Sequence, residues 1–189
     1  MAAQTFTFCP NCKTKNKTGK CKKCKLPPIF VVGERNSLLG TLIHDFKYNS
    51  VRALAKPLAE LLDRTLPNLP ENTVIVPLPT ATHHIRARAL DHTYNIAKHL
   101  AKLRGLKVEK LLLRTKNTVQ VGSDEKTRLK QAASAFELNE TLKIDNSKTY
   151  LLIDDVWTTG ASMKAAIKKL RAGRVSKIIV GILAVNSLN

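Results

Sequence analysis

A run of thirteen residues, Tyr150 to Ser162, holds the residue types from which a site for a phosphorylated sugar can be built. An apolar segment is followed by two adjacent carboxylates, Asp154 and Asp155, and then by a turn rich in hydroxyl groups. A segment of helical periodicity starts at Ala161. Because the N–H groups and the dipole of a first helical turn attract anions, this order predicts a phosphate site. The carboxylates only accept hydrogen bonds, which suits the vicinal hydroxyls of a ribose.

This run resembles the phosphoribosyl pyrophosphate (PRPP) signature of the type I phosphoribosyltransferases, in which an apolar strand, two acids and a Thr-Thr-Gly turn follow one another. Trp157 is bulkier than the residue usual at that place. The resemblance implies that the turn cradles the 5′-phosphate and that the two acids face the ribose and the waters of its metal ion. The implied phosphate-binding residues are Thr158, Thr159, Gly160, Ala161 and Ser162. The alternative is an ordinary buried strand with Asp154 flanking a helix, but two adjacent buried acids are costly unless they are used.

All four cysteines of the chain lie near its start, in two Cys-x-x-Cys pairs. Each pair can place two thiolates on one metal ion, and four thiolates complete a closed tetrahedral zinc site of the structural kind. Disulfides are the alternative, and a redox pair is a weaker one because no strand–helix pattern surrounds these cysteines. The predicted ligands are Cys9, Cys12, Cys21 and Cys24.

The net charge of +18 on 189 residues predicts attraction to polyanions such as nucleic acid, nucleotides or pyrophosphate. Aromatic residues make up only 5% of the chain, so a stacking platform for single-stranded nucleic acid is not evident. No apolar run has the length of a membrane span, and the N-terminus lacks the apolar core of a signal peptide. We therefore expect a cytoplasmic protein without membrane insertion.

Periodicity predicts an α/β fold with a mostly parallel sheet flanked by helices, because apolar strands alternate with amphipathic helices. The ligand site of such a fold lies at the carboxyl ends of its strands. The expected strands are 29–32, 73–79, 108–113, the strand of the signature and 177–185. The expected helices begin near residue 37, near Leu54, at Asp91 and at Ala161, with a short one over 128–133, and residues 114–126 are expected to form a loop.

Taken as a whole, the chain resembles the ComF family of phosphoribosyltransferase-like proteins, which is associated with DNA uptake in competent bacteria. The resemblance assigns residues 1–28 to an N-terminal zinc ribbon and residues 29–189 to a domain of the type I phosphoribosyltransferase fold. Its other motifs are Leu42 to Tyr48, Val76 to Pro79 with Arg86-Ala87-Arg88, and Gln120 to Gly122 with Arg128 and Ala135-Phe136. After Arg88 the family has Gly-Phe-Asn or Gly-Phe-Asp, where this chain has Ala89-Leu90-Asp91.

The resemblance implies PRPP as ligand, Mg²⁺ bound with it, and Asp154 and Asp155 as the candidate catalytic residues. Arg86 and Arg88 are then candidates for the pyrophosphate, since guanidinium forks match phosphate oxygens. The chain is either a phosphoribosyltransferase with an unidentified acceptor or a DNA- or nucleotide-binding competence factor that binds PRPP without turnover. Single-stranded DNA, a nucleotide and proteins of the competence machinery are its expected partners.

At several positions a purely structural role is an alternative to a role in binding or catalysis. The two arginines also fit a solvated basic loop, and His83 and His84 fit exposed loop residues better than catalytic ones. Asp91 and His92 are expected to cap and begin a helix, and Gly105 is expected to be its C-cap. Lys47 and Tyr48 are expected to serve packing and the charge of a helix end, not catalysis.

Overall fold

The computed structural model describes residues 8–14, 18–36, 38–49, 51–80, 91–115 and 135–186. Its centre is a five-stranded sheet in the order β1-β7-β6-β2-β3, in which every pair is parallel. This sheet confirms the predicted α/β class. Its strands are β1 (Ile29–Glu34), β2 (Thr73–Pro77), β3 (Lys107–Val108), β6 (Thr149–Trp157) and β7 (Lys177–Val185).

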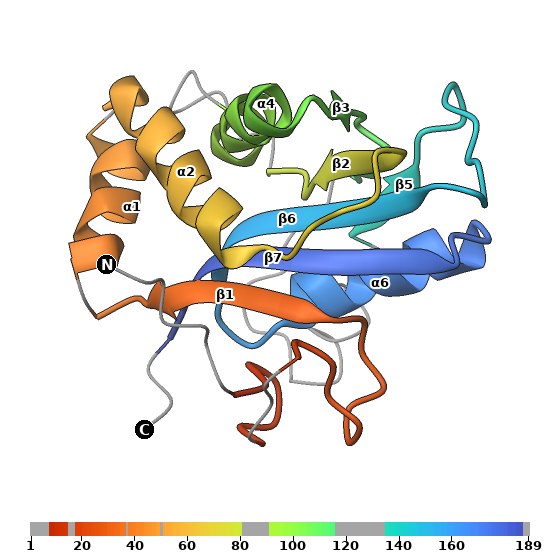
Figure 1. The fold of residues 1–189 in the computed structure, drawn as a ribbon, viewed down its shortest axis with the longest axis horizontal. Coiled ribbons are helices and arrows are strands. Elements are labelled where there is room, and N and C mark those ends of the chain that lie inside the picture. The colour runs from red at the N-terminus through yellow and green to blue at the C-terminus, as the bar shows by residue number, and fades with distance from the viewer. Residues whose placement is uncertain are drawn as a thin grey trace.

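Helices cover both faces of this sheet (Figure 1). On one face, α1 (Leu38–Tyr48), α2 (Ala55–Thr65) and α4 (His92–Arg104) share a core with Leu151 and Ile153 of β6. On the other face, α6 (Ala161–Ala172) packs against Tyr150 and Leu152. Because both faces are covered, the central strands are apolar on both sides, which explains the continuous apolar runs of the sequence.

A two-stranded antiparallel sheet of β4 (Leu112–Arg114) and β5 (Phe136–Leu138) lies on the α6 side of the molecule. The sequence predicted one strand over 108–113, and this prediction was wrong. Lys107 and Val108 pair with β2, whereas Leu112 pairs with β5 and is buried in the core beneath α6. The polar residues Glu109 and Lys110 lie between the two strands. Val108, before them, packs in the core beneath α2 and α4, and Leu112, after them, packs in the core beneath α6.

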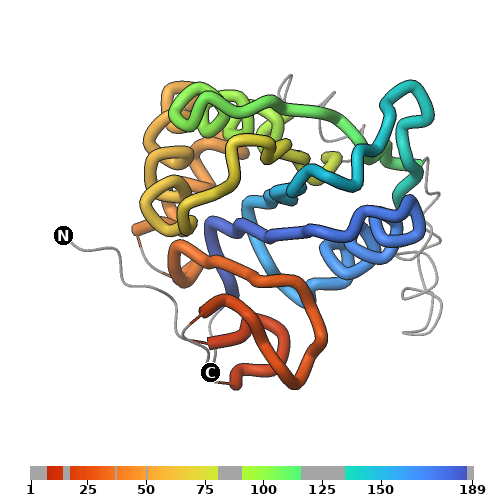
Figure 2. The backbone as a smooth tube through the Cα atoms, turned by 45° about the vertical axis from the view of Figure 1, so that its right-hand side comes forward, coloured from red at the N-terminus to blue at the C-terminus, as the bar shows by residue number. Residues whose placement is uncertain are grey.

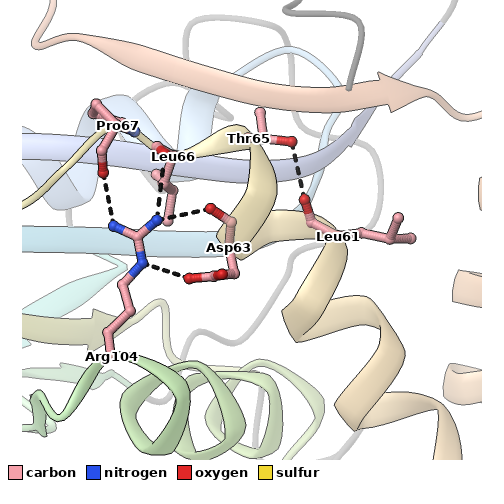
Figure 3. A network of polar contacts seen from close by, with 6 residues as sticks. All are labelled: Leu61, Asp63, Thr65, Leu66, Pro67 and Arg104. Atoms are coloured by element: carbon pink, nitrogen blue, oxygen red, sulfur yellow. Dashed lines mark hydrogen bonds and ion pairs between the residues drawn. The ribbon is translucent and has the colours of Figure 1, made fainter. Parts of the chain in front are cut away.

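The ends of α4 follow the predicted capping. The side chain of Asp91 accepts a hydrogen bond from the backbone N–H of Tyr94, and Gly105 ends the helix with φ +64°. Arg104 then joins this end to the end of α2 (Figure 3). Its guanidinium is paired with the carboxylate of Asp63 and donates hydrogen bonds of 2.7 Å to the carbonyls of Asp63 and Pro67.

The N-terminal segment lies beside β1, at the lower edge of the view in Figure 2. The N–H of Ile29 donates to the carbonyl of Gly19 at 2.8 Å, and Leu26 packs against the core beneath α6. Gly19 has φ +73°, and a Cβ there would meet the ring of Phe30 at 3.0 Å. The segment is thus fitted against the sheet. Within the described residues, none of the helices is long and apolar enough to cross a bilayer.

Candidate functional site

The signature residues form one continuous strand–turn–helix unit from β6 to α6. Asp154 and the turn Thr158–Ser162 line the same small pocket, of about 60 Å³. Thr158 and Thr159 are exposed, and Gly160, the N-cap of α6, has no side chain with which to cap the helix. Ala161 donates its backbone N–H to Oγ1 of Thr159 at 3.3 Å. The start of α6 thus lines a pocket that is also lined by hydroxyl groups, which is a suitable geometry for an anion.

Gly160 meets two structural demands at once. Its φ of +72° lies in the left-handed region, and a Cβ at this position would sit 2.2 Å from Cζ2 of Trp157. Trp157 is buried, so its ring has no room to retreat. The tight turn therefore depends on the glycine and the bulky tryptophan as a pair.

The two acids lie within β6, two residues before its end. The strand continues for two residues beyond the acids, because β7 extends far enough to pair with Val156 and Trp157. On the other side, the pairing with β2 stops at Ile153, where Pro77 is the last partner. The acids consequently lie just beyond the end of β2, at the carboxyl edge of the sheet where sites of such folds occur.

Neighbouring residues of a strand point to opposite faces, and this separates the two carboxylates. Asp154 lines the pocket beside the turn, whereas Asp155 forms an ion pair with Lys47 of α1, with 2.7 Å between Nζ and Oδ1. Both partners are largely buried, with side chains 19% and 12% exposed. Lys47 holds Asp155 in one position, so this lysine is part of the candidate site and not only the charge at a helix end.

Burial raises the pKa of Asp154 above its ordinary value, and the neighbouring charge of Asp155 raises it further. Three groups act in the opposite direction: the N–H of Asp155, which donates to Asp154 Oδ1 at 2.8 Å, and the charges of Lys47 and Arg114. A bound cation would favour the ionised carboxylate, so the donor chemistry here suits a hard divalent ion held through oxygen ligands or waters.

Arg114 is the second basic residue that the sequence interpretation did not assign to the site. It lies at the end of β4, and burial lowers its pKa while the charge of Asp154 raises it. Its Nη1 lies 3.5 Å from the carbonyl of Pro79, in the segment after β2. The sequence signal was present, because an arginine closes an apolar run there, but only the fold brings that run next to β6.

A larger cavity of about 370 Å³ lies between the segment after β2 and strand β4, and Arg114, whose charge acts on Asp154, is one of its lining residues. Pro77, Pro79 and Arg114 line it, together with Asp91 and Lys110, whose Nζ is 3.6 Å from the Asp91 carboxylate. This cavity offers space for a ligand in addition to the small pocket of the turn.

Several predicted residues lie outside the described part of the chain. These include Arg86 and Arg88, His83 and His84, the stretch 120–128 and the short helix over 128–133. His92 is described: it is buried edge-on against the ring of Phe46, with the centroids 4.9 Å apart. The prediction that Asp91 and His92 cap and begin a helix is thereby confirmed.

The four cysteines form a cluster in which all sulfur atoms lie within 4.8 Å of one another. The Sγ atoms of Cys12 and Cys21 are 3.5 Å apart, and those of Cys9 and Cys24 are 3.9 Å apart. Tetrahedral coordination at ordinary zinc–sulfur distances requires about 3.8 Å between sulfurs. All four are free thiols in this structure, so the donor set fits one metal ion.

The two Cys-x-x-Cys pairs also share a backbone feature. Lys13 follows the first pair and Lys25 follows the second, and both have positive φ, +60° and +52° respectively. In the first pair, the N–H of Lys13 donates to the carbonyl of Cys9 at 2.9 Å and closes the turn. Two turns of the same hand thus present the two halves of the thiol cluster.

Neither a protein-family model nor a curated protein sequence matches this chain. Two solved structures are similar over 70% of it at 16% identity and a TM-score of 0.49: the allosteric regulatory enzyme of purine biosynthesis, and the glutamine PRPP amidotransferase of B. subtilis complexed with ADP and GMP. The match covers 26% of each, so this chain spans about a quarter of their length. A hypoxanthine phosphoribosyltransferase of Staphylococcus aureus is similar over 72% of this chain and 64% of its own, at 14% identity and a TM-score of 0.39.

Proposed function

We propose that this protein is a phosphoribosyltransferase-like protein of the ComF type that binds PRPP together with Mg²⁺ at the carboxyl edge of β6. One observation carries the proposal: Asp154 and every residue of the turn Thr158–Ser162 line a single pocket at the start of α6. A chance match of sequence would not require the acid, the hydroxyls and the first residues of α6 to line one cavity.

Each part of the site has a role in this proposal. The hydroxyls of Thr158, Thr159 and Ser162 and the first N–H groups of α6 hold the 5′-phosphate. Asp154 accepts hydrogen bonds from the ribose hydroxyls. Asp155 is held by its ion pair with Lys47 and fixes this part of β6 against α1. Arg114 and, by the family resemblance, Arg86 and Arg88 face the pyrophosphate.

In transfer, the bond between the anomeric carbon and pyrophosphate breaks and a bond from that carbon to a nitrogen nucleophile forms. The positive charge that develops on the ribose is stabilised by the carboxylate of Asp154, and the negative charge on the leaving group by the guanidinium groups. Mg²⁺, when bound, supplies further charge neutralisation at the pyrophosphate. The cavity of about 370 Å³ beside Arg114 is the place for the acceptor.

The direct test is calorimetric titration of PRPP with Mg²⁺ into the full chain and into Asp154→Ala/Asp155→Ala. We expect the wild type to bind and the double variant to lose detectable binding. The matched control is Glu137→Ala/Glu140→Ala, which removes two exposed acids elsewhere and should change affinity by no more than about twofold.

Removal of Asp155 also unpairs Lys47, so a milder variant keeps the test interpretable. Thr158→Val changes only an exposed hydroxyl of the turn, and it should weaken PRPP binding about tenfold while leaving thermal unfolding unchanged. A folded wild-type protein that takes up no PRPP would overturn the proposal.

We also propose that the cysteine cluster holds one structural zinc ion, and that residues 1–28 form a separate ribbon attached to the domain 29–189. The distances between the sulfurs support the metal. Elemental analysis of protein purified without added metal should give one zinc per chain. A chain that contains none while its four thiols react freely would contradict this assignment.

A second candidate function is binding of DNA or a nucleotide in competence, with PRPP as a bound regulator and no turnover. The observation that favours it is the charge of +18, combined with an N-terminal segment in which no acid precedes Glu34. The two candidates are separated by incubating PRPP, Mg²⁺ and candidate acceptor bases with the protein. Release of pyrophosphate supports transfer, and binding without release supports the second candidate.

A further inference from the structure

At the edge of the sheet opposite the signature turn, the structure has a third pocket, of about 410 Å³. One wall comes from the N-terminal segment and the other from the end of α6 and the start of β7. Five of its lining residues carry a positive charge, and no acid lines it among the residues that the structure describes. We call this cavity the basic pocket, and its cations are Lys20, Lys22, Lys25, Arg171 and Lys177.

The two walls are joined directly, so the pocket is a built feature of the fold. Arg171 donates a hydrogen bond to the carbonyl of Lys25, 3.5 Å away, and Leu26 packs into the core beneath α6. All five cations are exposed on the surface around the cavity. Among the described residues no carboxylate is paired with these cations, so their mutual repulsion costs stability that a bound anion would restore.

Neutralising the thiolates does not account for these charges. Four thiolates around one divalent ion retain two negative charges, fewer than the five cations of the basic pocket. The end of α6 attracts cations to its last turn, but this explains Arg171 and not the lysines of the opposite wall. A surplus of positive charge remains for an external ligand.

A stripe of cations leads from the basic pocket along α6. Lys164, Lys168 and Arg171 are spaced four and three residues apart, so they share one face of the helix, and all three are exposed. The sequence of α6 contains no acid to pair with them. The stripe from Lys164 to Arg171 spans about 10 Å along the helix axis, so it is longer than a single phosphate group and fits a ligand with several phosphates in a row.

From the pocket, its two walls and the stripe, we propose that the basic pocket and the exposed face of α6 bind the phosphodiester backbone of a single-stranded nucleic acid. No aromatic side chain lines the pocket among the described residues, so the backbone is recognised and the bases are not read. The proposal rests on the second candidate function above and gives it a location. A strand on this face runs toward the signature turn, since α6 begins there.

The test is fluorescence anisotropy of a labelled oligothymidylate of about 20 nucleotides, titrated with the full chain at low salt. The pocket variant is Lys22→Gln/Lys177→Gln, with one cation removed from each wall. The control variant is Lys56→Gln/Lys102→Gln, which removes two exposed lysines of α2 and α4. Both lower the net charge equally, so any difference between them reports location.

We expect the pocket variant to weaken binding about tenfold and the control less than about threefold. A third variant, Lys164→Gln/Lys168→Gln, should fall between them because it alters only the stripe. Equal weakening by the pocket and control variants would mean attraction by net charge alone and would overturn the proposal. Absence of binding by the wild type at low salt would also overturn it.

Two further measurements distinguish this proposal from binding of a small polyphosphate and from an effect on the PRPP site. In the first, binding of inorganic tripolyphosphate is measured on the wild type and on the pocket variant. If tripolyphosphate binds and the pocket variant weakens it, while the oligonucleotide does not bind, the pocket takes a small polyphosphate. The assignment to nucleic acid then fails. Calorimetry of PRPP with Mg²⁺ is repeated on the pocket variant. Unchanged affinity for PRPP shows that the pocket variant loses oligonucleotide binding without disturbing the site at the signature turn.

Discussion

The two ends of α6 present opposite chemistry. At its first turn, hydroxyl groups, the backbone of the helix start and the carboxylate of Asp154 surround a pocket of about 60 Å³. At its last turn, five cations and no described acid surround a cavity of about 410 Å³. The first end offers both donors and acceptors, so it can distinguish a sugar phosphate from other anions. The second end offers only positive charge, so it selects by charge and shape.

This difference shows how one helix can serve selective and unselective binding of phosphate. Selectivity requires groups held in fixed positions, and the first end has them in the Trp157–Gly160 contact and the Lys47–Asp155 pair. Unselective binding requires only long, exposed side chains near one another. The two ends should therefore respond differently to mutation, salt and pH.

The largest effect is expected at the rigid end, from Gly160→Ala. The left-handed φ and the clash with Trp157 together predict a loss of about 3 kcal/mol in the free energy of unfolding. Urea unfolding measures this, and PRPP binding should be lost as well. Trp157→Leu in the same chain should recover part of the stability by removing the clash but not the strain. Wild-type stability in Gly160→Ala would refute the paired role of the two residues.

Salt should separate the two ends almost as strongly. Five phosphate contacts at the basic pocket predict that oligonucleotide affinity falls about 100-fold between roughly 50 and 200 mM salt. PRPP binding should fall much less, because fixed hydrogen bonds and Mg²⁺ contribute to it. Parallel titrations over this range provide the measurement. A flat profile for the oligonucleotide would contradict phosphate recognition at the basic pocket.

Lys47→Met should reduce stability by about 2 kcal/mol, because it leaves the carboxylate of Asp155 buried without its partner. The figure is below that of a fully buried pair because both side chains keep some contact with solvent. Lys47→Met/Asp155→Leu removes both charges and should be more stable than the single variant. Thermal and urea unfolding of all three chains measures the coupling. Additive losses would show that the pair is not coupled.

A smaller effect concerns pH at the same end. Because burial raises the pKa of Asp154 in the folded protein, the folded state holds this proton more tightly than the unfolded state does. The resulting stabilisation is full below the unfolded-state pKa of about 4 and is lost as pH rises toward the raised folded value. Asp154→Asn should therefore lose less stability than the wild type between pH 5 and pH 8, as measured by urea unfolding. Identical slopes for the two chains would show that the carboxyl group is not perturbed.

Much of the fold followed from local pattern. Apolar runs predicted β2, β6 and β7, and the capping residues Asp91 and Gly105 predicted the ends of α4. The strand predicted over 108–113 was wrong because periodicity cannot show that Val108 and Leu112 join different sheets. That division depends on which partner strands are available, and these are distant in sequence.

The candidate site divides in the same way. The turn Thr158–Ser162 was predicted from adjacent residues, since a strand–turn–helix unit is a local structure. Lys47 and Arg114 were not assigned to the site, because they reach the acids from α1 and β4. Their contact with the acids depends on how those elements pack on the sheet, and no local signal encodes it.

The sequence by itself therefore determined the parallel α/β class, the signature turn and the four thiols, because each depends on the types and spacing of neighbouring residues. The tertiary structure alone decided that Asp154 and Asp155 serve opposite faces of β6, and that lysines of the N-terminal segment meet Arg171 and Lys177 in one cavity. The reason is physical: strand alternation and sheet pairing fix direction and distance between residues that are far apart along the chain.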